Sequence, residues 1–177
     1  MGVKVDTRQL EKFSKDIARL STQQADEFME FALRQTAIGF LGAVIEATPV
    51  GDSRKNKDGE TIHVGGSLRR AWTCNTEAQA EAGMQQDSAM YIAGRKLEER
   101  KRGGHYSMTL KNPMHYASYV EYGHKQKPGR FVPAIGKRLV NRFVEGVHFV
   151  KETEEDFREA APAELQRMLD DYLKKVF

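Results

Sequence analysis

The feature that most constrains the fold is a long apolar segment with clear signals at both ends. Ser21-Thr22-Gln23-Gln24 resembles a capping box, which marks a helix start. Thr48-Pro49 marks a stop, because proline disfavours helical backbone in the residue before it. Between these signals apolar residues recur at helical spacing, and the stretch from Ala37 to Ile45 is apolar nearly all round. We therefore expect one helix through about Ala47, covered on both faces toward its C-terminal end.

Helices are also expected at the two ends of the chain. Asp6-Thr7-Arg8-Gln9 resembles another capping box, and the apolar spacing behind it predicts a helix that ends near Leu20. The pattern becomes helical again from about Val147. Pro162 is expected to open a separate final helix with a full apolar stripe.

The middle of the chain alternates loosely between apolar and polar residues, which is typical of short strands with one exposed face. The expected strands cover residues 67–76, 77–83, 89–93 and 106–110, followed by extended segments at 131–133 and 139–144. The predicted fold class is α+β, with a small, mostly antiparallel sheet packed against N-terminal and C-terminal helices.

The length of 177 residues fits one domain of ordinary size, so a single α+β domain over 1–177 is expected. Two polar stretches interrupt it: a mobile insertion loop at 51–66 and a charged tip at 95–104. Cys74 is the only cysteine, which rules out an intrachain disulfide and favours a small buried side chain. No signal-peptide core and no apolar run near the roughly 20 residues that span a bilayer are seen, so a cytosolic protein without membrane contact is expected.

The net charge of +3 hides an uneven distribution. Residues 51–150 carry 17 basic and 10 acidic side chains, whereas residues 151–177 carry 5 basic and 8 acidic ones. A basic middle can face DNA or an acidic neighbouring subunit. We favour the subunit, because Lys and Arg are not clustered on one helix.

Residue types that carry catalysis or bind metals form no recognisable motif. The five histidines are scattered, and none forms a metal-binding pair on one helix. Gly65-Gly66-Ser67 lacks the rest of a phosphate-binding loop, and there is no nucleophile elbow. We therefore expect no enzymatic activity, no metal and no cofactor.

The segment from Asn112 to His124 combines helix signals with an unusual number of tyrosines. Asn112 can cap a short helix, Pro113 suits its first position, and Gly123 can adopt a left-handed conformation just past its end. The three tyrosines are Tyr116, Tyr119 and Tyr122, and Glu121 is expected to face outward. Two interpretations remain open: core residues whose hydroxyls reach the edge of the domain, or a subunit contact, where tyrosine is enriched.

This segment resembles the hallmark of the neck or tail-completion proteins at the head–tail junction of long-tailed bacteriophages. The resemblance extends to Thr48-Pro49-Val50 and to the Leu68-Arg69-Arg70-Ala71-Trp72 stretch upstream. It continues downstream through Gly129 to Pro133 and through Phe143 to Phe149. One departure is the insertion from Gly51 to Val64, which replaces the tight turn of the family.

The resemblance implies a non-enzymatic structural or assembly protein of a phage or prophage. It would reside in the virion, and in the host cytoplasm during assembly, in contact with other head–tail junction or tail proteins and with copies of itself in a ring. The candidate subunit-contact residues are Tyr119, Glu121, Tyr122 and Arg130. The alternative class is a nucleic-acid-binding or DNA-processing protein that uses the basic middle region; direct DNA contact is the less favoured of the two.

Overall fold

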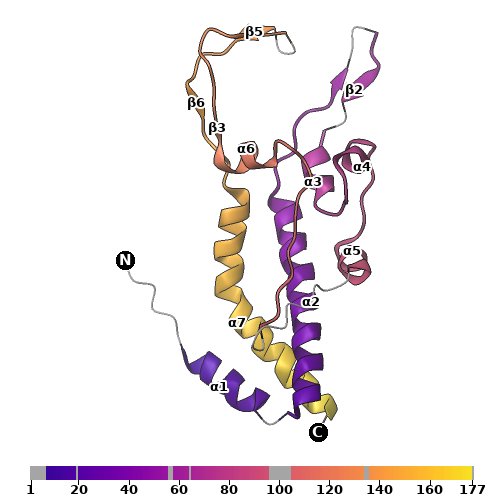
Figure 1. The fold of residues 1–177 in the computed structure, drawn as a ribbon, viewed down its shortest axis with the longest axis vertical. Helices are drawn as coiled ribbons and strands as arrows, with labels where there is room; N and C mark the ends of the chain where they lie inside the picture. Colours follow the sequence, from indigo (N-terminus) through magenta and orange to yellow (C-terminus); the bar gives the residue numbers. More distant parts are fainter. Residues whose placement is uncertain are drawn as a thin grey trace. The chain divides into compact units, whose positions relative to one another are not determined.

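The computed structural model describes residues 7–18, 20–55, 58–63, 65–95, 105–133 and 136–176, and shows seven helices and three two-stranded antiparallel sheets among them (Figure 1). The helices are α1 (Thr7–Ile17), α2 (Thr22–Ala47), α3 (Ser67–Ala71), α4 (Glu77–Glu81), α5 (Ser88–Gly94), α6 (Ala117–Tyr122) and α7 (Phe149–Val176). The strands are β1 (Arg54–Lys55), β2 (Thr61–His63), β3 (His124–Lys125), β4 (Phe131–Val132), β5 (Lys137–Arg138) and β6 (Phe143–Val144). The α+β class is confirmed.

The chain packs as two compact units. Unit 1 takes the described residues of Met1–Ala43, Asp87–Leu110 and Thr153–Phe177, and unit 2 takes those of Val44–Gln86 and Lys111–Glu152. Two of the four divisions fall inside α2 and α7, so both long helices contribute to both units.

The core of unit 1 forms where α1, α2 and α7 present their apolar stripes. Phe28 and Leu169 are fully buried there, with Leu20 and Ala32 beside them. The ring of Phe28 lies 6.2 Å from that of Phe13 and 5.5 Å from that of Tyr172. Three stretches distant in sequence thus share one apolar cluster, as their helical spacing predicts.

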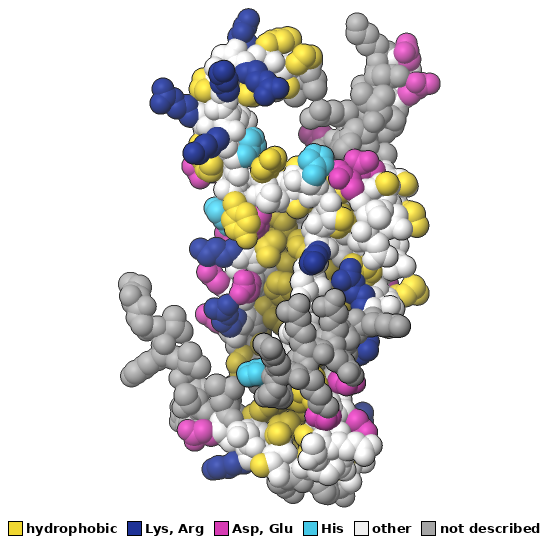
Figure 2. Space-filling model, in the orientation of Figure 1, with side chains coloured by type: hydrophobic (Ala, Val, Ile, Leu, Met, Phe, Trp, Pro, Cys, Tyr) yellow, Lys and Arg dark blue, Asp and Glu magenta, His cyan; other side chains and the backbone are white. Residues whose placement is uncertain are grey.

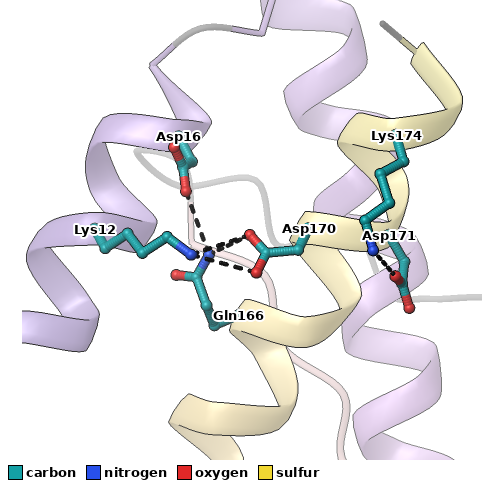
Figure 3. A network of polar contacts seen from close by, with 6 residues as sticks. All are labelled: Lys12, Asp16, Gln166, Asp170, Asp171 and Lys174. Carbon is teal, nitrogen blue, oxygen red and sulfur yellow. Dashed lines mark hydrogen bonds and ion pairs between the residues drawn. The ribbon is translucent and has the colours of Figure 1, made fainter.

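Polar contacts also join α1 to α7 in unit 1, as Figure 3 shows. Lys12 Nζ donates to both carboxylate oxygens of Asp170 at 3.3 Å. Gln166 Nε2 donates to Asp170 at 2.8 Å and to Asp16 at 3.3 Å. The hydrogen bond from Gln166, followed by the charge of Lys12, holds the pKa of Asp170 below its ordinary value.

In unit 2 the indole of Trp72 anchors α3 to the end of α2. Trp72 is buried, and its Nε1 donates to Thr48 Oγ1 at 2.9 Å. Arg69 Nη2 donates to the backbone oxygen of Thr48 at 2.7 Å and to that of Glu46 at 3.2 Å. The Arg69 guanidinium therefore supplies donors to carbonyls that the end of α2 leaves without helical partners.

The sequence predicts that the apolar end of α2 is covered by protein and that the chain does not span a membrane. Within Ala37 to Ile45 every residue except the two glycines is buried or half-buried, but Gly39 and Gly42 leave one side of the helix exposed, so the expectation that both faces are covered is wrong. By length and composition, α2 is the one helix in the described part of the chain that could cross a membrane, which corrects the expectation that no apolar run approaches that length. Phe28, Leu41 and Val44 are fully buried in protein, while 28% of the apolar stretch of α2 is buried.

The four strands predicted between residues 67 and 110 are wrong. Residues 67–76, 77–83 and 89–93 contain α3, α4 and α5 instead, and residues 106–110 form no strand. Local caps decide the outcome: Thr76 and Gln79 form a capping box at α4, and the Asp87 carboxylate accepts from two backbone N–H groups at the start of α5. These caps stabilise helix starts that loose alternation of side chains does not reveal.

The final helix also differs from the prediction. Residues 149–176 form one continuous helix with Pro162 inside it, rather than a helix that Pro162 opens. Proline removes one backbone donor and clashes with the carbonyl four residues earlier. Phe157, before Pro162, packs against Phe40, and Leu169, after it, lies in the core of unit 1. This packing on both sides offsets the local cost of the proline and keeps the helix continuous.

The insertion at 51–66 contains a short antiparallel hairpin, in which Arg54 pairs with His63 and Lys55 with Thr61. Its expected mobility stays a prediction. Of the charged tip at 95–104, only Arg95 belongs to the described residues; the remainder of that expectation lies outside them.

Candidate subunit interface

The described residues of 124–144, which are 124–133 and 136–144, form the two sides of a β-hairpin, which we call the hairpin arm. Its base is the β3–β6 pair, with His124 opposite Val144 and Lys125 opposite Phe143. Its outer part is the β4–β5 pair (Figure 1). Backbone bonds continue the ladder between the two pairs: Gln126 N to Arg142 O at 2.8 Å, Gly129 N to Leu139 O at 2.8 Å and Leu139 N to Arg130 O at 2.9 Å. The extended segments expected near 131–133 and 139–144 thus lie on opposite sides of one hairpin.

The hairpin arm is strongly basic. Six Lys or Arg side chains lie within 124–144, and Glu121 and Glu145 are the acidic residues that flank it. All six cations are exposed: Lys125, Lys127, Arg130, Lys137, Arg138 and Arg142. Figure 2 shows dark blue side chains gathered over the arm. Among the residues that the structure describes, none of the six forms an ion pair with a carboxylate.

Apolar side chains are exposed on the same element. Phe131 is 51% exposed, Val140 83% and Phe143 41%. Tyr119, Tyr122 and Val147, next to the arm in sequence, are also exposed. Exposed apolar side chains that are gathered on one element, instead of scattered over the surface, indicate an interaction site.

The root of the arm is a close crossing of backbones that requires two glycines. A Cβ atom on Gly146 would lie 2.1 Å from the backbone oxygen of Glu121. A Cβ on Gly123 would lie 2.3 Å from the backbone oxygen of Val144, and Gly123 has a φ of 78°, as the left-handed expectation for this residue requires. The N–H of Val147 donates to Val120 O at 2.8 Å across the same crossing. Side chains at these glycine positions would force the arm away from α6.

Glu121 holds this root to the start of α7. Its side chain is buried, with Oε2 accepting from Val150 N at 2.9 Å and Oε1 from Lys151 N at 3.0 Å. The expectation that Glu121 faces outward is therefore wrong. The first turn of a helix carries unpaired N–H groups and a partial positive charge, and both attract a carboxylate. Glu121 thus positions the candidate interface from inside the subunit.

The other candidate contact residues are accessible. Tyr119 and Tyr122 on α6 are exposed, and Arg130 is exposed on the arm. The ring of Tyr119 lies 5.5 Å from that of His124 at the base of the arm. Tyr116 is half-buried instead, and burial, followed by the charges of Glu77 and Glu81, raises the pKa of its phenol. The half-burial of Tyr116 suits a residue at the edge of the core, whereas the exposure of Tyr119 and Tyr122 is compatible with a subunit contact, which stays a prediction.

The short helix begins later than expected. α6 starts at Ala117, so Asn112 is not its cap and Pro113 is not its first residue. Asn112 instead accepts from Met114 N at 3.1 Å and donates to the backbone oxygen of Leu68 at 2.9 Å. It connects this segment to α3, within unit 2.

Sequence reasoning missed the arm as a unit. Two signals could have revealed it: the Lys127-Pro128-Gly129 turn sequence, and the run from Tyr122 to Val144 without an acidic residue. Its strand pairs were hidden because each is only two residues long.

The described residues of unit 2 also line a pocket at Pro49, Val50, Leu68, Tyr116 and Val147, but they do not gather the groups of a metal or nucleophile site. No group of three potential metal ligands occurs in that part of the chain. Cys74 is buried, as expected, and burial raises the pKa of its thiol, so the unreactive protonated form is favoured.

Comparison with known proteins finds a family model that matches most of the chain. The family model described as "Bacteriophage HK97-gp10, putative tail-component" matches residues 11–123, which is more than half of the sequence. No curated protein and no solved structure matches the chain. The match spans α1 through α6 and ends at Gly123, so the hairpin arm and α7 follow it.

Proposed function

The chain belongs to the HK97-gp10-like family of phage tail components, and on that premise we propose that it acts at the head–tail junction of a long-tailed phage or prophage. There it serves as a neck or tail-completion protein and performs no catalysis. The observation that carries the proposal is the family match over residues 11–123, which includes both the Trp72 anchor and the tyrosine-bearing helix α6.

Such a protein would act through contacts with neighbouring subunits. Tyr119, Tyr122 and Arg130 are exposed next to or on a basic arm, while the buried Glu121 carboxylate fixes the base of that arm. Aromatic and arginine side chains are enriched where proteins associate. We therefore propose these three residues as subunit contacts, with other head–tail or tail proteins and with copies of this chain in a ring. The protein would reside in the virion after assembly in the host cytoplasm.

The test of the function is deletion of the gene in a phage that encodes this chain. If the protein completes the junction, lysates of the deletion mutant accumulate heads and tails that are not joined, which electron microscopy detects. Resupply of the wild-type gene restores joined particles. Normal joined virions from the deletion mutant would overturn the proposed function.

The contact residues are tested in the same system. The double variant Tyr119→Ala/Tyr122→Ala should fold normally, since both side chains are exposed, but should give few joined particles. Met90→Ala is a matched control, because Met90 on α5 is 66% exposed and Tyr122 is 67% exposed. Joined particles in normal number from the double variant would show that this surface is not a contact.

The arm contains Lys and Arg but no Asp or Glu, which supports a second candidate function, the binding of nucleic acid. Six exposed cations on one hairpin could contact phosphates. Binding of this kind weakens steeply as salt concentration rises, because counterions are released from the phosphates. A DNA shift assay over a range of salt concentrations measures that slope, and a complete absence of shift at low salt removes this candidate.

A further inference from the structure

The cross-strand pairs give the hairpin arm a mixed surface. Phe131 lies opposite Arg138, and Phe143 lies opposite Lys125. Side chains of directly opposed residues project on the same face of a hairpin and are close neighbours. Each exposed phenyl ring is therefore paired with an exposed cation. A partner that contacts both the rings and the cations must offer an apolar surface as well as negative charge.

A two-stranded hairpin is also only marginally stable by itself in water. Most of the described residues of the arm are exposed and the others are half-buried, and its cations have no carboxylate partners among the described residues of the subunit. A contact outside the subunit would provide apolar burial for its rings and counter-charges for its cations.

The same chain carries a surface of opposite charge on the first half of α7. Glu152, Glu155, Asp156 and Glu159 stand at positions i, i+3, i+4 and i+7, so they form a stripe along one helix face. We call it the acidic stripe. All four side chains are exposed. Like charges at these spacings repel one another, and a cationic partner would convert that repulsion into attraction.

The dimensions of the two surfaces are compatible. The acidic stripe extends over roughly 10 Å, at about 1.5 Å of rise per helical residue. One strand side of the arm, from His124 to Val132, extends over roughly 26 Å, at about 3.3 Å per residue. The arm can therefore cover the whole stripe with part of its length.

From these observations we propose that the hairpin arm of one subunit docks on the acidic stripe of a second copy of this chain. The inference rests on the proposed function, since it describes how copies would join at the tail. The arm and the stripe are different surfaces, so the contact is heterologous, and repetition of it builds a ring or a helix of subunits. The exposed rings favour a protein partner over the phosphate backbone of duplex DNA, because phenyl and valyl side chains gain from burial against protein and gain nothing from phosphates.

Exchange of charges between the two surfaces tests the proposal. The arm variant carries Lys125→Glu and Lys137→Glu, and the stripe variant carries Asp156→Lys and Glu159→Lys; all four positions are exposed. The control variant Glu11→Lys/Glu30→Lys makes the same change in charge as the stripe variant, at exposed positions on α1 and α2. Trp72 fluorescence and the melting temperature of each variant should match those of the wild type.

Each variant is then supplied to phage that lack the gene. We expect the arm variant alone and the stripe variant alone to lose joined particles, because like charges then meet at every contact. Supplying the two variants together should restore joined particles, since the acidic arm of one meets the basic stripe of the other. A single chain with all four substitutions should restore them as well, and the control variant should remain normal.

The outcomes separate this inference from the function on which it rests. Joined particles in normal number from the arm variant or from the stripe variant overturn the contact, whereas the gene deletion tests the function. Failure of both the mixture and the four-substitution chain to restore assembly also overturns the contact. If only the arm variant fails, and it also loses the salt-dependent shift of DNA, the partner of the arm is nucleic acid and the proposal is wrong.

Discussion

At the scale of single residues, Thr48 shows how a small polar side chain can hold a helix end. It is fully buried, and its hydroxyl donates to Val44 O at 2.6 Å while accepting from Trp72 Nε1 at 2.9 Å. Its backbone oxygen accepts from Arg69 Nε at 3.1 Å. The hydroxyl and the backbone oxygen of Thr48 thus both have partners, which removes the cost of burying them.

The Thr48–Trp72 pair predicts a graded loss of stability. Trp72→Ala should lower the free energy of unfolding by about 3–5 kcal/mol, because it leaves a cavity. Thr48→Val keeps the shape but leaves the indole N–H unpaired, at a cost of about 1–3 kcal/mol. Urea denaturation measures both. Thr109→Val is the control at an exposed threonine, where a change within about 0.5 kcal/mol is expected. Equal stability of Trp72→Ala and wild type would show that the indole contributes no packing.

At the scale of elements, the start of α7 depends on a distant helix. His148, just before α7, has a positive φ of 57°, which few residues other than glycine adopt at low cost. The carboxylate that caps α7 comes from Glu121 on α6, 29 residues before Val150. The geometry of the arm root and that of α7 are therefore set together by one side chain and by the close approach of Gly123 and Gly146.

Two glycine substitutions should have opposite effects. Gly146→Ala places a methyl group 2.1 Å from the backbone oxygen of Glu121, and the required shift should cost about 1–3 kcal/mol of stability. Gly42→Ala, on the exposed side of α2 with nothing within 4 Å of the added carbon, should stabilise the protein by about 1 kcal/mol, as alanine does within a helix. Thermal or urea unfolding compares the two variants. A stabilising Gly146→Ala would contradict the close crossing at the arm root.

At the scale of the whole molecule, the chain passes between the two compact units four times, and two of these divisions lie inside helices. They fall between Ala43 and Val44 within α2 and between Glu152 and Thr153 within α7. Helix formation is cooperative along the chain, so loss of one half of a helix destabilises the other half. The units are therefore expected to unfold together, as the expectation of a single domain over 1–177 requires.

A substitution in one unit, observed by a probe in the other, tests this coupling. Leu169→Ala removes a fully buried side chain from unit 1 and should cost about 2–5 kcal/mol. The single tryptophan, Trp72, reports on unit 2. We expect the urea midpoint from Trp72 fluorescence to fall together with the midpoint from far-UV circular dichroism. If the Trp72 midpoint stays at its wild-type value, the units unfold separately and the chain has two domains.

The amino-acid sequence by itself determined the features that local signals encode. The ends of α2, the helix near residues 7–20, the burial of Cys74, the α+β class and the family all follow from short motifs and from apolar spacing. Such signals are strong because a capping residue, a proline or an apolar stripe acts within a few residues of the structure that it specifies.

Only the tertiary structure decided the features that depend on distant partners. Glu121 is exposed on a helical wheel but buried in the fold, because the start of α7 lies against it and attracts its carboxylate. α7 continues through Pro162 because packing on either side outweighs a lost backbone bond. The arm became visible only when its strands paired, since strands of two residues have too little pattern to read from the sequence.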